Sequence, residues 1–333
     1  HFICMKELIA NFSNHLRESL EIIASTNLKS GDEPIENVII SGLGGSGIGG
    51  TIVAEILRPI CKVPVFVNKD YSIPSFTNSK TLFIACSYSG NTEETLMATK
   101  SAQSKGAQIA CISSGGELLK IAQDNDYNVL SMKGGFAPRS MFAYSFSFLC
   151  RYFEFYGLAD LEVNKNLNQA ITILDQSESE TLVKAEKLAE ALFSKTAILY
   201  AVSGHLGIAS RWRQQLNENA KMLAWEAEIP EMNHNELVGW EGGNSDFVPV
   251  FLRNKNDFNR NQKRIEIIQN IISQKSPEIH EIWSLGESDI ERSLYLIHFG
   301  DWTSYFLSEL NKVDIMDIKS IDLLKSELAK LPL

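Results

Sequence analysis

The sequence predicts an α/β protein with two doubly wound domains, each built on a parallel central sheet. Apolar runs of strand length alternate with amphipathic segments of helix length, a pattern typical of parallel sheets covered by helices. The pattern restarts near Thr196, where a strand and a Gly/Ser turn echo residues 39–50. The chain has 333 residues, more than a single hydrophobic core usually holds. We therefore assign residues 1–157 to a first domain and residues 158–333 to a second.

Five strands are predicted in the first domain. The first, at residues 38–41, leads through a glycine-rich turn into a helix that contains Ile52 and Ile56. An aromatic-rich helix extends from Pro138 to Gly157 and closes the domain. The remaining strands are expected at residues 65–67, 81–86, 108–113 and 127–131.

The second domain is predicted to begin with a polar helix over about residues 164–194, followed by a strand at residues 196–202. Further strands are expected at residues 247–252 and 278–285, with a helix around Ile268 between them. Only the first domain keeps a dense set of Gly and Ser turns. We therefore expect the first domain to hold the anionic part of a ligand and the second to contribute other residues.

Charge and cysteine content narrow the class of protein. The formal net charge is −10, so neither nucleic acid nor an anionic membrane is expected as the main partner. The five cysteines form no CxxC pair, which argues against a disulfide framework or a zinc site and favours a reducing compartment, here the cytoplasm. The sequence has no apolar run of about 18 residues, so we expect no membrane span. We also expect no signal peptide, and Met5 is a candidate for the natural start.

The first candidate site is the glycine-rich turn at residues 42–50. Glycines let the backbone approach a ligand closely, and free N–H groups at a helix start favour an anion. Gly42, Gly44 and Gly47 also satisfy the GxGxxG dinucleotide fingerprint. That fingerprint requires an acidic residue about 20 positions later, and the nearest candidate, Asp70, lies late. This pattern alone leaves a phosphate site, a dinucleotide site and a purely structural turn open.

The second candidate site is the segment at residues 86–95, between a buried strand and a helix. Ser87, Ser89 and Thr92 can donate hydroxyl hydrogen bonds where the helix N-terminus favours negative charge. Thr92 or Asn91 could also cap the helix. Capping and phosphate binding are compatible, because a phosphate would accept from the same unpaired N–H groups. Both candidate sites follow their strands directly, where ligands bind in open α/β sheets.

Several short segments resemble known sugar isomerases. Those typical of a sugar isomerase (SIS) domain are the Gly-Gly-Ser-Gly turn at residues 44–47 and the segments at 87–95 and 112–116. Other segments resemble a narrower family, the bifunctional phosphoglucose/phosphomannose isomerases. These segments are Pro138-Arg139 and residues 217–221 and 230–236. The resemblance extends from about residue 35 to the C-terminus. It implies two SIS-type domains and the interconversion of glucose 6-phosphate, and of mannose 6-phosphate, with fructose 6-phosphate.

The resemblance also implies roles for particular residues. Glu218 would be the base at C2 and His234 would assist ring opening, within a homodimer whose sites each take the partner's His234. A lysine near the C-terminus is implied as well; Lys325 matches best, and Lys312 and Lys319 are alternatives. The residues implied around the sugar phosphate are Gly45, Ser46, Ser87, Ser89, Thr92 and Pro138, with Arg139 beside them to stabilise charge.

Each implied role has a plain structural alternative. Glu218 lies in a helical pattern between two asparagines and could be a solvated surface residue. Arg139 could likewise be an ordinary residue at a helix start. His234 could join a nearby glutamate in a metal site or a polar network, although its surroundings form no HExxH or other zinc pattern. The other histidines expected to be structural are His205, His280 and His298.

The residue types suit the implied chemistry. Moving a proton between C1 and C2 of an aldose passes through an enediolate, which needs a carboxylate base and a donor to the developing oxyanion. Ring opening needs an acid or base that titrates near neutral pH, a task suited to histidine. Neither step needs a metal or a redox cofactor, so we expect none.

Two other classes of protein stay open. A non-catalytic SIS regulator would bind a phosphosugar but would have no need of Glu218 and His234 together, so their joint presence favours an enzyme. A nicotinamide-dependent oxidoreductase is suggested by the GxGxxG match alone.

Overall fold

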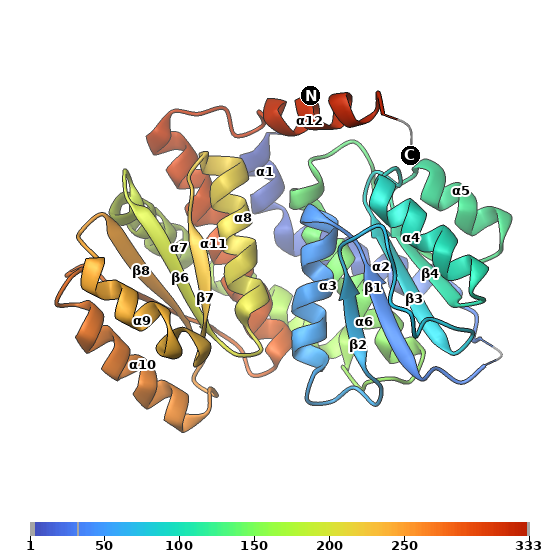
Figure 1. The fold of residues 1–333 in the computed structure, drawn as a ribbon, viewed down its shortest axis with the longest axis horizontal. Helices are drawn as coiled ribbons and strands as arrows, with labels where there is room; N and C mark the ends of the chain where they lie inside the picture. Colours follow the sequence, from blue (N-terminus) through green and yellow to red (C-terminus); the bar gives the residue numbers. More distant parts are fainter. Residues whose placement is uncertain (1–3, 32, 332–333) are drawn as a thin grey trace.

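The protein contains two parallel β-sheets that stand side by side, each with helices on both faces (Figure 1). The computed structural model describes residues 4–31 and 33–331. The prediction of an α/β fold with two parallel sheets is confirmed. Within the described ranges, no helix is both long enough and apolar enough to cross a membrane.

The first sheet has the strand order β2-β1-β3-β4-β5, and all neighbouring strands are parallel. The chain leaves β1 toward one edge and returns on its other side at β3, so the topological switch point lies between these two strands. Ligands bind at such points, outside the carboxyl ends of the strands. All five predicted strands are present to within one residue. They are Asn37–Ser41 (β1), Val65–Asn68 (β2), Thr81–Ser87 (β3), Gln108–Ser113 (β4) and Asn128–Ser131 (β5).

Helices cover both faces of the first sheet. Helices α3 and α6 pack on the face that shares a core with the second domain, and α4 and α5 pack on the opposite face. Helices α1 and α2, which have no counterpart among the predicted elements, pack against α11 and α6. The helices are Met5–Ala10 (α1), Phe12–Ser25 (α2), Gly44–Leu57 (α3), Glu93–Ser104 (α4), Gly116–Asp124 (α5), the 3₁₀ turn Pro138–Met141 (η1) and Phe142–Phe155 (α6).

The glycine-rich turn is shorter than predicted, because α3 already begins at Gly44. Two of its glycines instead allow close packing inside the domain. A Cβ atom on Gly47 would lie 2.3 Å from the carbonyl oxygen of Gly42, and one on Gly50 would lie 2.7 Å from Cγ2 of Ile40. Glycine therefore lets the first turns of α3 lie directly against β1.

The second sheet has the strand order β7-β6-β8-β9 and is also parallel. Its edge strand β7 was not predicted, because Glu226 and Glu228 interrupt an otherwise apolar run. In the structure, Glu226 accepts hydrogen bonds from Ser210 and Arg213 of α8, so its charge is paired at the sheet edge. Strand β9 is shorter than predicted. The strands are Thr196–Val202 (β6), Trp225–Ile229 (β7), Phe247–Arg253 (β8) and His280–Trp283 (β9).

The long helix α11 was also not predicted. It is buried on nearly every side, and polar residues such as Asp301 and Ser304 are satisfied inside the protein, so the sequence shows no amphipathic period. With α7 and α8 it covers the inner face of the second sheet, and α10 covers the outer face. The helices are Val163–Leu192 (α7), Leu206–Ala220 (α8), Asn259–Ile272 (α10), Asp289–Asn311 (α11) and Lys319–Leu328 (α12).

Short turns replace a full crossover helix between β7 and β8. They are Glu231–His234 (η2), Glu236–Gly239 (α9) and Trp240–Gly242 (η3). The segment that carries His234 therefore lies between a strand and a one-turn helix. From sequence, Pro230 and the polar run at residues 233–235 predict a loop between two helices. This prediction is wrong, because strand β7 precedes the segment.

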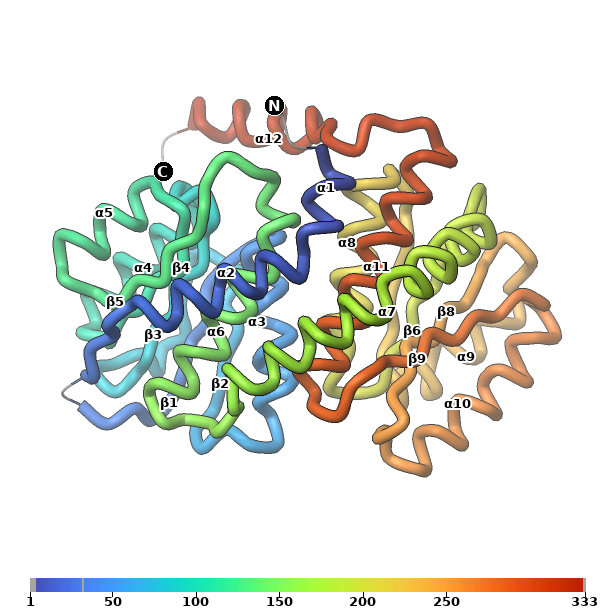
Figure 2. Tube along the Cα trace, turned by 180° about the vertical axis from the view of Figure 1, so that it is seen from behind, coloured from blue at the N-terminus to red at the C-terminus, as the bar shows by residue number. Residues whose placement is uncertain are grey.

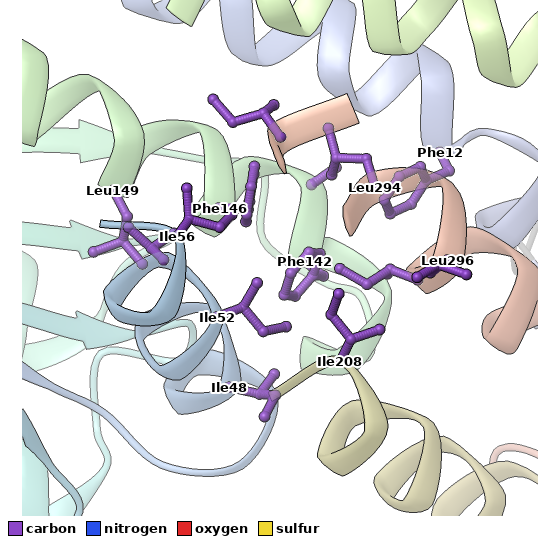
Figure 3. Close-up of a cluster of buried hydrophobic side chains, with 14 of the residues drawn as sticks. Phe12, Ile48, Ile52, Ile56, Phe142, Phe146, Leu149, Ile208, Leu294 and Leu296 are labelled. Carbon is purple, nitrogen blue, oxygen red and sulfur yellow. The ribbon is translucent and has the colours of Figure 1, made fainter. Parts of the chain in front are cut away.

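One hydrophobic core runs through both domains. Figure 3 shows Ile52 of α3, Ile208 of α8 and Phe142 of α6 within this cluster. Seen from behind in Figure 2, α7 crosses the molecule from the first domain to the second sheet. The predicted domain boundary after Gly157 falls in the link between α6 and α7.

Candidate active site

Polar groups gather at the carboxyl ends of β1 and β3, where α3 and α4 begin. Ser46 accepts a hydrogen bond from the Tyr88 N–H at 3.0 Å. The buried Ser87 hydroxyl pairs with that of Thr92 at 2.8 Å. The exposed Ser89 accepts from a backbone N–H of its own loop at 3.2 Å. Ser46 and Ser89 act as acceptors in these bonds, so each keeps a hydroxyl proton to donate to an anion.

Gly45 joins this cluster to the segment that begins at Pro138. A Cβ atom on Gly45 would lie 3.0 Å from the backbone nitrogen of Arg139 and 3.2 Å from the carbonyl carbon of Pro138. Any larger residue would push the two segments apart. The absence of a side chain at Gly45 thus brings Arg139 next to the hydroxyl cluster.

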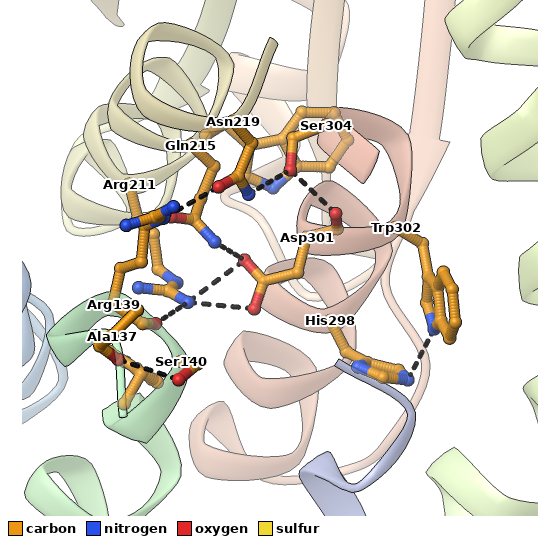
Figure 4. Close-up of polar contacts among 12 residues, drawn as sticks. Ala137, Arg139, Ser140, Arg211, Gln215, Asn219, His298, Asp301, Trp302 and Ser304 are labelled. Carbon is orange, nitrogen blue, oxygen red and sulfur yellow. Dashed lines mark hydrogen bonds and ion pairs between the residues drawn. The ribbon is translucent and has the colours of Figure 1, made fainter. Parts of the chain in front are cut away.

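The Arg139 guanidinium is buried and held on three sides. Its Nε donates to Oδ1 of Asn219 at 2.7 Å (Figure 4), and one terminal nitrogen donates to the carbonyl of Ile315 at 2.7 Å. The other terminal nitrogen faces Oε2 of Glu218 at 3.4 Å. Burial lowers the pKa of Arg139 and the Glu218 carboxylate opposes that shift. The group stays a cation, because arginine does not lose its proton in proteins.

A second buried cation lies behind Arg139. Arg211 donates to the carbonyl of Arg139 at 3.1 Å and to both carboxylate oxygens of Asp301 at 3.0 and 2.8 Å (Figure 4). Gln215 donates to Asp301 at 2.8 Å. Burial raises the pKa of Asp301 and Arg211 opposes that rise. Because every one of these charges is paired and hydrogen-bonded, the network fixes the backbone that carries Arg139.

Glu218 lies in the last turn of α8, near the end of the helix that meets Arg139. Its side chain is 28% exposed, so the carboxylate reaches both the buried guanidinium and solvent. Lys221 ends the helix in a left-handed conformation and donates to the Glu218 carbonyl at 2.5 Å. Burial, followed by the charge of Arg139, lowers the pKa of Lys221.

No role is predicted from sequence for Asn219 and Lys221, which lie in the motif at residues 217–221, or for Tyr88, which lies in the segment at residues 87–95. Their place beside Glu218 and Ser46 gives them contacts with the site. The motif at residues 217–221 was the available signal, because it contains Asn219 and Lys221 together with Glu218. Nothing in the sequence indicated that Ile315 would accept a hydrogen bond from Arg139.

His234 does not join Glu218 within one chain. It is exposed in η2, just beyond the carboxyl end of β7, whereas Glu218 lies on α8 shortly before the amino end of β7. The five residues of β7 span roughly 16 Å. The fold therefore keeps these two predicted site residues at opposite ends of one strand.

The three candidate lysines lie in the C-terminal segment. Lys312 ends α11, and Lys319 pairs with Asp317 at 3.1 Å. Lys325 lies on α12, a helix without buried residues that runs along the top of the molecule in Figure 1. No hydrogen bond or ion pair joins Lys325 to Arg139 or Glu218. The link to the site is instead the Ile315 carbonyl, a few residues before α12.

His205, His280 and His298 lie outside this cluster. His298 is buried, its Nε2 accepts from the Trp302 indole at 3.0 Å, and burial lowers its pKa to about 4 (Figure 4). Burial also lowers the pKa of His205, whose Nε2 lies 4.0 Å from Asp289. His280 lies 3.4 Å from Glu278. Among residues 4–31 and 33–331, no three His, Cys, Asp or Glu side chains are grouped so as to hold a metal ion.

Comparisons with known proteins match a SIS-type family model in each domain. Residues 34–136 match the family model of the SIS domain, and residues 183–328 match that of the bacterial phospho-glucose isomerase C-terminal SIS domain. A solved structure with a similar fold is the C-terminal domain of glucosamine-fructose-6-phosphate aminotransferase from Francisella tularensis. Its TM-score is 0.77 at 14% identity, over 93% of this chain and 97% of that one. Fold and site thus define a double SIS-domain protein.

Two curated relatives narrow the class. The bifunctional phosphoglucose/phosphomannose isomerase of Caldicellulosiruptor bescii is 36% identical over 98% of this chain and 99% of its own length. The enzyme of the same name from Aquifex aeolicus is 33% identical over 89% of this chain and 92% of its own. The chain belongs to the bifunctional phosphoglucose/phosphomannose isomerase family.

Proposed function

We propose that this protein is an aldose–ketose isomerase that interconverts glucose 6-phosphate and mannose 6-phosphate with fructose 6-phosphate. The name of the family supports this reaction. The observation that carries the proposal is the position of Glu218. Its carboxylate lies 3.4 Å from a buried guanidinium whose backbone touches the hydroxyl cluster. A candidate base, a fixed cation and an anion-binding site therefore lie next to one another.

The phosphate of the substrate binds at the hydroxyl cluster. Ser46, Ser87, Ser89 and Thr92 supply neutral donors, and the N-termini of α3 and α4 add unpaired N–H groups. Gly45 lets the backbone of Pro138 and Arg139 lie directly against this cluster. Neutral donors suit a phosphate that must also leave, and they allow an acidic protein to bind an anion locally.

Glu218 is the base that transfers the proton between C2 and C1. Its carboxylate removes the C2 proton of the open-chain aldose and returns it to C1, while the hydroxyl proton on O2 passes to O1. Together these transfers convert the aldehyde to a ketone without net oxidation. Negative charge moves onto the substrate oxygens in the enediolate. Arg139 stabilises that charge from a fixed position, because Asn219 and Ile315 hold its other nitrogens.

Ring opening requires a second group, which we assign to the partner's His234 in a homodimer. The motivation is the separation of His234 from Glu218 by the length of β7 within one chain. The exposed η2 turn can reach outward to a neighbouring copy. A lysine completes the site; Lys325 stays the first candidate, because α12 continues the segment that binds Arg139 through Ile315.

We further propose a cytoplasmic protein that needs no metal or redox cofactor, with the domains divided at residues 157 and 158. All five cysteines are free thiols, which is typical of a reducing compartment. The buried thiols of Cys86, Cys111 and Cys150 belong to the hydrophobic cores and are not part of the candidate active site.

The test is a coupled assay that starts from fructose 6-phosphate and measures glucose 6-phosphate and mannose 6-phosphate separately, with and without a chelator. We expect both products, at rates that the chelator does not change. Binding of a phosphosugar with no turnover would instead support the non-catalytic regulator. Binding of NAD, measured with isotope-labelled NAD or by displacement of a dye, would support the oxidoreductase.

A further inference from the structure

Tyr88 ties together three segments that surround the candidate active site. It follows the last residue of β3 and is 8% exposed. Its N–H donates to Oγ of Ser46 at 3.0 Å. Its carbonyl accepts from the N–H and the hydroxyl of Ser114 at 3.0 and 2.6 Å. These backbone contacts do not depend on the Tyr88 side chain.

The phenol hydroxyl makes a different connection. It donates to the carbonyl of Lys133 at 3.0 Å and accepts from the N–H of Phe136 at 2.9 Å. Residues 133–137 have no regular secondary structure and lead directly into Pro138. Besides this hydroxyl, the segment is held at Lys133 by an ion pair with Glu18 of α2, at 2.8 Å.

We propose that the Tyr88 hydroxyl is a positioning group that keeps Arg139 in place relative to the sugar-phosphate site. The inference rests on the isomerase function proposed above. The hydroxyl fixes residues 133–137 against the loop that contains Ser87 and Ser89. That segment sets where Arg139 starts, and the Arg139 backbone in turn rests on Gly45. A displacement of this segment would move the guanidinium relative to Glu218, while the phosphate-binding loop keeps its own hydrogen bonds.

Tyr88→Phe separates this role from simple packing, because it removes the hydroxyl and keeps the ring. Tyr152→Phe is a matched control: Tyr152 is fully buried on α6, and its hydroxyl donates to the Cys111 carbonyl at 2.8 Å. The measurements are kcat, KM for the sugar phosphate, and the inhibition constant of inorganic phosphate. A role confined to the phosphate loop would change phosphate inhibition as much as kcat.

For Tyr88→Phe we expect kcat to fall at least about tenfold, while KM and phosphate inhibition change less than about threefold. Tyr152→Phe should leave kcat within about twofold of the wild type. Hydrogen exchange of residues 133–137 should become faster in Tyr88→Phe and not in Tyr152→Phe, because Phe136 loses its acceptor. Glu18→Gln loosens the same segment at Lys133 and should give a smaller fall in kcat with unchanged phosphate inhibition.

The proposal is overturned if Tyr88→Phe keeps wild-type kcat, or if phosphate inhibition weakens in step with kcat. Unchanged hydrogen exchange in Tyr88→Phe would also overturn it, and that measurement does not require activity. A wild-type protein without isomerase activity rejects the proposed function instead. The two failures are therefore distinguishable.

Discussion

Arg139 shows how one residue depends on distant parts of the chain. Asn219 of α8 and Ile315 beyond α11 accept from its guanidinium, and Arg211 donates to its carbonyl. With two of its nitrogens engaged, the third faces Glu218. A cation fixed in this way needs little reorganisation when charge develops on a substrate oxygen. The geometry at this scale therefore favours stabilisation of an enediolate.

Replacing Glu218 by Gln should lower kcat at least about a hundredfold while phosphosugar binding survives, because the loss affects a proton transfer in the transition state. The measurement is exchange of the C2 proton with solvent, followed by NMR, beside a binding titration. Glu186→Gln, at an exposed position of α7, serves as the control and should keep wild-type activity. Exchange at a near wild-type rate in Glu218→Gln would exclude this residue as the base.

Mannose 6-phosphate should be accepted as well as glucose 6-phosphate, because removal of the C2 proton gives the same planar enediolate from either epimer. We expect its kcat/KM to exceed one hundredth of that for glucose 6-phosphate, a limit equal to about 2.7 kcal/mol of discrimination. Met316 is half-exposed and follows Ile315, whose carbonyl accepts a hydrogen bond from Arg139, so we choose its side chain to test for an influence on this ratio.

The matched variants for this prediction are Met316→Ala and Met97→Ala, the latter at an exposed methionine of α4. We expect the ratio of the two kcat/KM values to change more than about threefold in Met316→Ala and to stay unchanged in Met97→Ala. A wild-type ratio below one hundredth would contradict acceptance of both epimers but leave the isomerase proposal intact.

At the scale of elements, α8 and β7 decide which site residues can meet. Helix α8 leads from the carboxyl end of β6 back toward the amino end of β7, so Glu218 and His234 lie at opposite ends of β7. The same helix brings its C-terminal end to Arg139 and the first sheet. The proposed homodimer would supply a histidine near Glu218 from a second copy of the chain.

Mixed dimers test this sharing. Glu218→Gln and His234→Ala chains should each be nearly inactive alone, and an equal mixture should recover about a quarter of wild-type activity, since half of the dimers are mixed and each of these has one intact site. The control pairs Glu218→Gln with a chain that carries both changes, and no site in that mixture has an intact Glu218. Proven subunit exchange without recovery would refute a shared site.

At the scale of the whole molecule, α3 and α8 run antiparallel along the seam between the domains. One end of the seam carries the contacts of Gly45 and Asn219 with Arg139. At the other end, the carboxylate of Glu55 accepts from the Gly207 N–H at the start of α8, at 2.9 and 3.1 Å. Burial raises the pKa of Glu55 from 4.5 to about 7, although this hydrogen bond opposes the rise.

The stability of the protein should therefore depend on pH through Glu55. Because its folded pKa lies above its unfolded value, the proton stabilises the folded state fully below pH 4.5, and that stabilisation is lost as the pH rises toward 7. Glu55→Gln does not titrate and can still accept from Gly207. We expect the free energy of unfolding of this variant, relative to wild type, to rise between pH 5 and pH 7 by at most about 1.4 kcal/mol per pH unit.

Chemical denaturation of both proteins at several pH values measures this difference, and Glu186→Gln again provides an exposed control. Parallel pH profiles for wild type and Glu55→Gln would show that the seam does not hold a protonated carboxyl.

The sequence by itself determined the alternation of strands and helices, and it gave the strands of the first sheet almost to the residue. Their runs are apolar and end at Ser or Asn, so local patterning suffices. It failed at β7 and α11 for one physical reason. Charged residues interrupt these elements, and only partners from other segments, such as Arg213 for Glu226, make their burial or pairing favourable.

The hydroxyl cluster could also be found from sequence, because Ser87 ends β3 and both Ser46 and Thr92 lie within five residues of the carboxyl ends of β1 and β3, which share one edge. Tertiary structure alone decided that Glu218 lies beside Arg139, 79 positions away, since that contact depends on the packing of α8 against the first domain. Tertiary structure also decided that His234 lies away from Glu218, at the opposite end of β7. Sequence motifs indicate which side chains suit a reaction, whereas distances between them are fixed by burial of the helix faces that carry them.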